Sequence, residues 1–276
     1  MSRSPAGGSL GIIAGTGFTD LGSMAESTTG DFTTGDFTTG NFITGNVDTA
    51  YGPVHLTRRS WHGRDTCFIA RHGPGHRLPP HRVNYRANLQ ALADAGVTQI
   101  LAVNVVGGIG LAAGEIVVVD DFIDFTRSRE LTYFDGTTPE GVVHVDMTEP
   151  YDPGLRRVLL QAAAACDCPV VDGGVYGAFE GPRFETKAEI RMAGAMGVTV
   201  VGMTGVPEVV LAAELGIAFA CLCLVANPAA GLGTAPITMA QVTQVVATGA
   251  GTVLRILDAA AGILADRTMD QGSQEH

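Results

Sequence analysis

The residues best suited to chemistry in this chain lie in four short segments, each bounded by glycine and each at the end of an apolar run. Together they offer hydroxyl groups, one guanidinium, one imidazole and backbone N–H groups beside glycine. Groups of this kind bind a tetrahedral oxyanion such as phosphate. We therefore predict a small-anion site built from Gly15-Thr16-Gly17, Arg71-His72-Gly73, Asn104-Val105-Val106-Gly107-Gly108 and Met203-Thr204-Gly205.

Other kinds of site fit the sequence less well. Gly15-Thr16-Gly17 lacks the third glycine of a dinucleotide-binding turn and the lysine of a P-loop. His72, His76 and His81 lie close together in sequence, but the prolines and glycines between them rule out a shared helix, and there is no H-E-x-x-H sequence. The G-x-S-x-G turn of serine hydrolases is also missing. We therefore expect no metal and no cofactor.

The elements that must position these segments alternate along the chain between apolar runs and helical patterns. This alternation indicates an α/β protein with a largely parallel sheet covered by helices on both faces. The glycine-bounded segments then fall at the carboxyl ends of strands, where open α/β sheets place their sites. No linker divides residues 1–276, so we expect one domain. The expected strands are 10–13, 66–70, 99–106, 115–122, 170–175, 198–201 and 218–225, and the expected helices are 83–95, 155–165, 186–196, 207–215 and 238–265.

The overall charge excludes several classes of partner. A net charge of −11 argues against a nucleic-acid or anionic-membrane partner, which would need a basic face. No apolar stretch approaches the roughly 20 residues of a membrane span, and the first residues do not form a signal sequence, so we expect a cytoplasmic protein. An anion must then be bound by a local cluster around Arg71 and His72. Reduced, buried cysteines would fit the same compartment, and the chain has five, Cys67, Cys166, Cys168, Cys221 and Cys223.

One segment breaks the α/β pattern. Residues 28–46 repeat a five-residue unit that ends in phenylalanine at Phe32, Phe37 and Phe42. We interpret it either as a surface insertion or loose hairpin, or as an arm whose phenylalanines pack on a neighbouring subunit. The polar tail from about residue 270 is expected to be frayed.

Longer motifs around these segments carry a resemblance to a known family. The chain resembles the trimeric purine nucleoside phosphorylases and 5'-methylthioadenosine phosphorylases over about residues 9–265, apart from the repeat. The resemblance implies one α/β domain around a mixed sheet, a homotrimer or a dimer of trimers, no metal, and phosphorolysis of a purine nucleoside. The motifs that carry it are Arg71-His72-Gly73, Pro79-Pro80-His81-Arg82-Val83-Asn84-Tyr85-Arg86-Ala87-Asn88, Glu180-Gly181-Pro182-Arg183-Phe184-Glu185-Thr186 and Gly202-Met203-Thr204-Gly205-Val206-Pro207-Glu208.

The same resemblance implies roles for individual residues. Phosphate attacks the anomeric carbon while the purine leaves, so the site must hold an anion and accept charge on the base. Met203 is expected to pack under the ribose and Phe184 to lie against the purine. His144 resembles the residue that reaches a neighbouring subunit's site, although an ordinary surface or core histidine is the alternative. The implied phosphate ligands are Thr16, Arg71, His72, the Val105 backbone and Thr204.

Two positions point to the base. Glu185 matches the glutamate with which 6-oxopurine members accept the N1–H of the base, and adenine-type members have a small hydroxyl residue there. Asn227 matches the asparagine of the 6-oxopurine branch, where adenine-type members have aspartate. An amide can both accept and donate at the O6/N7 edge. With His72, these two residues are the expected catalytic groups, and hypoxanthine or guanine is the expected base.

The expected 5' pocket is apolar. Met239 stands where ordinary 6-oxopurine enzymes have a histidine for the 5'-hydroxyl, and Val242 lies one helical turn further on. Such a pocket favours a methylthio group over a hydroxyl. We therefore predict cleavage of S-methyl-5'-thioinosine by phosphate to hypoxanthine and 5-methylthioribose 1-phosphate. Alternatives are a general inosine/guanosine phosphorylase, a methylthioadenosine phosphorylase, or an inactive nucleoside-binding protein, which the retained Arg71, His72 and Thr204 disfavour.

Overall fold

The computed structural model describes residues 8–18 and 43–272. Most of the 28–46 repeat therefore lies outside the described residues, as do residues 273–276 of the expected tail. The last four residues of the repeat belong to strand β2 (Ile43–Thr49), which pairs antiparallel with β3 (Gly52–Trp61).

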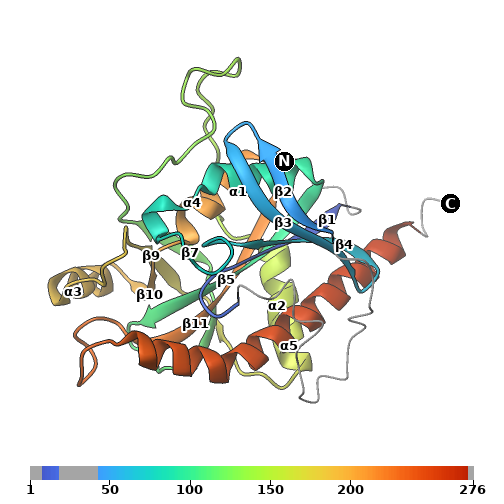
Figure 1. Cartoon of the computed structure of the whole chain (residues 1–276). Helices are drawn as coiled ribbons and strands as arrows, with labels where there is room; N and C mark the ends of the chain where they lie inside the picture. The colour runs from blue at the N-terminus through green and yellow to red at the C-terminus, as the bar shows by residue number, and fades with distance from the viewer. Residues whose placement is uncertain (1–7, 19–42, 273–276) are drawn as a thin grey trace.

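A single mixed sheet forms the centre of the molecule (Figure 1). One path runs through the strands in the order β2-β3-β4-β1-β5-β10-β9-β7, and β5 carries a branch through β11 and β6 to β8. Pairing is parallel between β1 and β4, between β1 and β5, and between β11 and β5. The remaining strands have the bounds β1 Ser9–Ala14, β4 Arg64–Ala70, β5 Val97–Gly108, β6 Ile116–Val118, β7 Asp121–Asp124, β8 Val171–Asp172, β9 Val175–Ala178, β10 Val198–Gly202 and β11 Ala218–Pro228.

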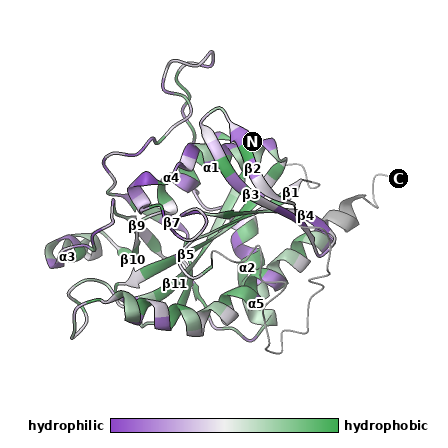
Figure 2. Ribbon diagram, viewed as in Figure 1, coloured by the Kyte–Doolittle hydropathy of each residue, from purple (hydrophilic) through white to green (hydrophobic). Residues whose placement is uncertain are grey.

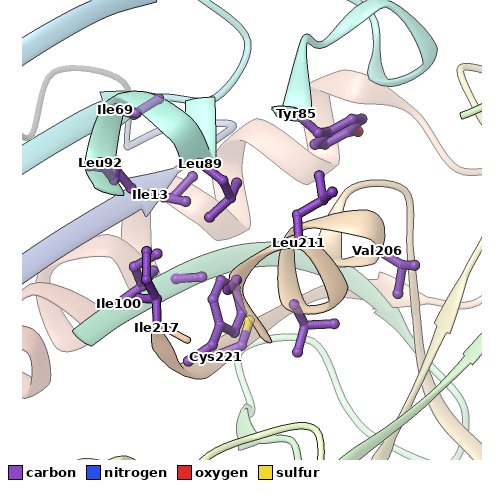
Figure 3. Packing of buried hydrophobic residues seen from close by; sticks show 14 of the residues in the cluster. Ile13, Ile69, Tyr85, Leu89, Leu92, Ile100, Val206, Leu211, Ile217 and Cys221 are labelled. Atoms are coloured by element: carbon purple, nitrogen blue, oxygen red, sulfur yellow. The ribbon is translucent and has the colours of Figure 1, made fainter. Parts of the chain in front are cut away.

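Helices cover both faces of the sheet, as the apolar runs predict. Along β1 and β5 the side chains alternate between two cores, because successive residues of a strand point to opposite faces. Ile13 and Ile100 face α1 (Tyr85–Asp94) and α4 (Gly205–Glu214), a packing that Figure 3 shows. Ile12 and Leu101 face α2 (Pro153–Ala165) and α5 (Met239–Gly272). A smaller cluster joins α3 (Lys187–Ala195) to β10.

The expected strands over 115–122 and 170–175 are each broken in two. The first divides into β6 and β7 around Asp120, and the second into β8 and β9 around Gly173 and Gly174. The two breaks face each other, because the Asp120 carboxylate accepts a hydrogen bond from Gly174 N at 2.8 Å. Both glycines have positive φ, of 89° and 148°. A local run of β-forming residues does not reveal such a break, because the strands exchange partners there.

The last helix extends further than expected. α5 continues to Gly272 rather than ending near residue 265, so the start of the expected frayed tail is helical. Its segment from Met239 to Arg267 has the length and composition that a membrane span would need, with a mean hydropathy of 1.3. Figure 2 shows its largely apolar character. Part of that character is accounted for by packing, since Val253, Ile256 and Leu257 are buried against β11 and α2.

All five cysteines carry free thiols. Four are buried, as expected for small hydrophobic residues, and only Cys166 is partly exposed. The Sγ atoms of Cys221 and Cys223 lie 3.8 Å apart inside β11.

Candidate active site

All predicted site residues except His144 meet in one cavity of about 510 Å³. It lies where β1, β4, β5, β10 and β11 end, so segments far apart in the chain, from Gly15 to Val242, contribute to it. The hydrogen bond from Arg71 N to Ala14 O, at 2.9 Å, continues the parallel β1–β4 pairing to the cavity wall. The predicted residues that line the cavity are Thr16, Arg71, His72, Val105, Phe184, Glu185, Met203, Thr204, Asn227, Met239 and Val242.

Arg71 is held rigidly by a buried carboxylate. Its Nε and Nη2 donate to Glu208 Oε1 and Oε2 at 2.5 and 2.7 Å, and its Nη1 donates to Val103 O at 3.0 Å. Both side chains are essentially inaccessible to solvent. Burial alone lowers the pKa of Arg71, but the facing carboxylate outweighs it and leaves the pKa raised. Arg71 is therefore a fixed cation with a fixed counter-charge, and three of its five N–H groups are already occupied.

His72 is neutral and presents an acceptor rather than a donor. Its Nδ1 lies 2.7 Å from Leu78 O, and a carbonyl can only accept, so Nδ1 carries the proton. Burial, with the Arg71 charge adding to it, lowers the pKa of His72 to about 4. The remaining ring nitrogen, Nε2, can then only accept a hydrogen bond. At neutral pH this nitrogen can accept from a protonated phosphate oxygen or a sugar hydroxyl.

The turn at Thr204 is held in place by the buried phenol of Tyr176. Tyr176 OH accepts hydrogen bonds from Thr204 N at 3.2 Å and Gly205 N at 3.1 Å. Those two N–H groups are thus occupied by a protein acceptor. The Thr204 hydroxyl donates at 3.5 Å to Asn104 Oδ1, and the Asn104 Nδ2 is buried without a protein partner. Side-chain groups therefore supply more of this wall than backbone amides do.

Phe184 and Glu185 line the cavity just before the start of α3. Arg183 forms two hydrogen bonds to Glu189, at 2.8 and 2.7 Å, and Thr186 and Glu189 form a reciprocal capping box. This clamp fixes the intervening Phe184 and Glu185. Glu185 is buried, and burial raises the pKa of its carboxyl group.

Asn227 faces the same cavity from a bulge near the end of β11. Its Nδ2 donates to Pro228 O at 2.7 Å, which leaves Oδ1 and one N–H of the amide available. The neighbouring Gly107 keeps this space open, because a Cβ there would lie 3.4 Å from Asn227 Nδ2 and 3.1 Å from Val201 Cγ2.

Three apolar side chains also line the cavity, those of Met203, Met239 and Val242. A Cβ added at Gly181 would lie only 2.5 Å from Met203 Sδ, and the φ of Gly181 is +63°. The glycine therefore leaves room for the methionine side chain to pack against it. Met239 begins α5 and is 56% exposed, while Val242 is buried one turn later. Thr238 precedes the helix and accepts a hydrogen bond from Gln241 N at 3.4 Å, which fixes where the helix begins.

One predicted residue lies away from the cavity. His144 is exposed on the long connection between β7 and α2, drawn in green and projecting from the body in Figure 1. Its predicted role in a neighbouring copy stays a prediction. Sequence reasoning also missed Glu208, Tyr176, His76 and Arg77, of which the last two line the cavity. Glu208 stands in a motif quoted above, but only the fold shows that it faces Arg71. Within residues 8–18 and 43–272, no group of three or more His, Cys, Asp or Glu side chains could hold a metal ion.

A family model described as the phosphorylase superfamily matches residues 9–261. The chain belongs to the phosphorylase superfamily. Its single-domain α/β fold and its enzyme class, a pentosyltransferase of the nucleoside phosphorylase type, are those of the family.

Individual relatives span most of the chain. A protein of Methanothermobacter thermautotrophicus named "Probable S-methyl-5'-thioinosine phosphorylase" is 44% identical over 91% of this chain and 82% of its own. A "6-oxopurine nucleoside phosphorylase" of Pyrococcus furiosus is 41% identical over 78% and 83%. The solved methylthioadenosine phosphorylase of Schistosoma mansoni, in complex with adenine, superposes with a TM-score of 0.81 at 30% identity, covering 96% of both chains.

Proposed function

We propose that this phosphorylase cleaves S-methyl-5'-thioinosine with phosphate to give hypoxanthine and 5-methylthioribose 1-phosphate. The observation that carries the proposal is that Glu185 and Asn227 line the same cavity as the apolar side chains of Met239 and Val242. Relatives named for methylthioinosine and for 6-oxopurine nucleosides support it.

The base pocket favours a 6-oxopurine for reasons of hydrogen bonding. A 6-oxopurine carries an N1–H that a carboxylate can accept, and the ionised Glu185 offers that acceptor. As the glycosidic C–N bond breaks and a phosphate oxygen bonds to the anomeric carbon, negative charge develops on the base. The base leaves with a proton at N7, which balances the proton that monohydrogen phosphate loses on becoming the sugar phosphate. The free Oδ1 of Asn227 can accept from that N7–H, while its remaining N–H can donate to O6.

The phosphate end would place the nucleophile at the carboxyl ends of the strands. The Thr16 hydroxyl and the two unoccupied N–H groups of Arg71 can donate to phosphate oxygens, and His72 Nε2 can accept from a P–OH group. The Thr204 hydroxyl can donate as well once it exchanges its 3.5 Å hydrogen bond to Asn104 Oδ1 for the anion. Both reactants are then held in one cavity, which removes the entropic cost of bringing them together in the reactive step. The reaction so described needs no metal and no cofactor beyond phosphate.

A panel of four nucleosides tests the proposal: S-methyl-5'-thioinosine, S-methyl-5'-thioadenosine, inosine and guanosine, each with and without phosphate. We expect phosphate-dependent release of hypoxanthine from methylthioinosine with the highest kcat/KM. Discrimination against the 6-amino analogue should be large, roughly 10⁴-fold, because the wrong edge leaves buried polar groups unpaired. Discrimination against inosine should be about 10-fold, since it rests on one or two CH₂-sized apolar units.

Asn227→Asp makes the base argument specific. A carboxylate at this position favours an amino-bearing edge, so the variant should gain activity on methylthioadenosine relative to methylthioinosine. An unchanged ratio of activity on methylthioadenosine to activity on methylthioinosine would contradict the role of Asn227. Equal rates of the unmodified protein on inosine and methylthioinosine would contradict the role of Met239. Absence of turnover on all four substrates would favour an inactive binding protein.

A general inosine/guanosine phosphorylase is the second candidate. The exposure of Met239 favours it, because a half-open pocket also tolerates a hydrated 5'-hydroxyl group. Comparable kcat/KM for inosine and methylthioinosine would select it.

The proposal includes a homotrimer in the cytoplasm, acting on small molecules without nucleic acid or membrane. His144 is exposed, as are its sequence neighbours Val142, which is 68% exposed, and Val143. Exposed apolar side chains favour contact with another copy. Light scattering should give the mass of a trimer. Mixing a His144→Ala chain with a chain inactivated at Asn227 should recover activity in mixed trimers if His144 serves its neighbour.

A further inference from the structure

The phosphate end of the cavity carries less positive charge than its residues imply. The charge of Arg71 is balanced by Glu208, which accepts two of its N–H groups. The two histidines there contribute little positive charge at neutral pH. Burial lowers the pKa of His72 to about 4, and desolvation also lowers the pKa of His76, whose ring lies 4.2 Å from that of His72. The whole chain meanwhile carries −11. Phosphate must therefore be drawn in against the overall field by a charge not yet counted.

Arg77 meets that need. It lines the same cavity, is exposed, and follows directly after His76 in the turn that leaves β4. The turn is built on left-handed backbone at Gly73, Gly75 and His76, with φ of 71°, 70° and 54°. Arg77 Nε donates to Pro74 O at 3.2 Å, which orients the side chain, and no carboxylate of the described residues pairs with its guanidinium. Its charge is uncompensated and its two terminal NH₂ groups are available.

We propose that Arg77 recruits phosphate to this site: it raises the local concentration of phosphate and lowers the KM for phosphate. Arg71 serves as a fixed hydrogen-bond donor, and the Arg71–Glu208 pair carries little net charge. A guanidinium at the mouth of a cavity attracts an approaching anion over about one Debye length, 8–10 Å at physiological salt. The same attraction applies to the sugar phosphate in the reverse reaction, because it carries the same anionic group.

The test compares Arg77→Gln with Arg82→Gln and Arg77→Lys. Arg82 is a matched control: it is exposed, lies five residues further on and does not line the cavity. At low ionic strength we expect Arg77→Gln to raise the KM for phosphate about 3- to 5-fold, the size of a solvent-exposed charge interaction, with kcat kept within about 2-fold. The difference should vanish in ~0.5 M salt. Arg77→Lys should recover most of the effect, because steering depends on charge rather than on shape, and Arg82→Gln should match the unmodified protein.

Two further measurements separate this inference from the proposed function on which it rests. In the reverse direction, Arg77→Gln should raise the KM for the sugar phosphate and leave that for hypoxanthine unchanged. Calorimetric titration with inorganic phosphate alone should show the same loss of affinity, and it needs no turnover. A raised KM for the nucleoside with unchanged phosphate binding would overturn the inference, as would equal effects of Arg77→Gln and Arg82→Gln. Failure of all four nucleosides to react would instead remove the proposed function.

Discussion

Replacing Glu208 with glutamine keeps the shape of the side chain but removes the carboxylate that faces Arg71. Breaking a fully buried ion pair from one side typically costs about 3–5 kcal/mol, because the other charge is left uncompensated. Unfolding entropy near 60 °C is about 2.1 cal/mol/K per residue, so a chain of 276 residues has roughly 0.6 kcal/mol/K in total. Glu208→Gln should therefore lower Tm by about 5–9 °C.

Phosphate distinguishes this account from simple damage to the core. A bound anion would supply the negative charge that Arg71 has lost, so phosphate should raise Tm by more in Glu208→Gln than in the unmodified protein. At 100 times Kd, the unmodified protein should gain about 2.7 kcal/mol, or roughly 5 °C by the same conversion. Scanning calorimetry with and without phosphate measures both effects.

The matched control is Asp65→Asn. Asp65 pairs with Arg58 at 2.5 Å, but these side chains are 37% and 49% exposed. An exposed pair contributes at most about 1 kcal/mol, so Tm should fall by less than about 2 °C. If Glu208→Gln lowered Tm no more than Asp65→Asn does, the buried pair would not stabilise the fold as argued. If phosphate raised Tm equally in Glu208→Gln and in the unmodified protein, Arg71 would not face the anion.

Two further predictions concern acid–base behaviour and space in the site. Burial raises the pKa of Glu185, so kcat/KM for the nucleoside at saturating phosphate should fall with decreasing pH from above the ordinary glutamate pKa of about 4.3, as the carboxyl group protonates and stops accepting N1–H. This fall at low pH should be absent in Glu185→Gln. Phosphate titrates in the same way in both assays, so its own titration cannot cause a difference between the two proteins. A fall that persists in the variant would belong to another group. Gly15→Ala would place a Cβ 3.0 Å from Arg71 Nη1 and 3.3 Å from His72 Cδ2, so the KM for phosphate should rise about 10-fold, measured by initial rates. An unchanged KM would show that this loop does not border the anion.

Much of the fold could be predicted because its signals are local. The runs over 10–13, 66–70 and 198–201 lie within β1, β4 and β10, and the helix expected over 186–196 begins at the capping box of α3. The hairpin of β2 and β3 was missed, since its alternation of buried and exposed residues is interrupted by polar positions such as Arg58 and Arg59. The broken strands around Asp120 could not be foreseen, because they depend on contacts with Gly174, 54 residues away.

The sequence by itself indicated which glycine-bounded segments meet at the cavity. Parallel strands bring their carboxyl ends to one edge of the sheet, so glycine-bounded segments after apolar runs were bound to converge there. Only the tertiary structure decided what those residues can do. Glu208 lies 137 residues from Arg71 and balances its charge, and Leu78 O fixes the tautomer of His72. Charge state and proton position depend on burial and on partners across the fold, which residue type and spacing do not specify.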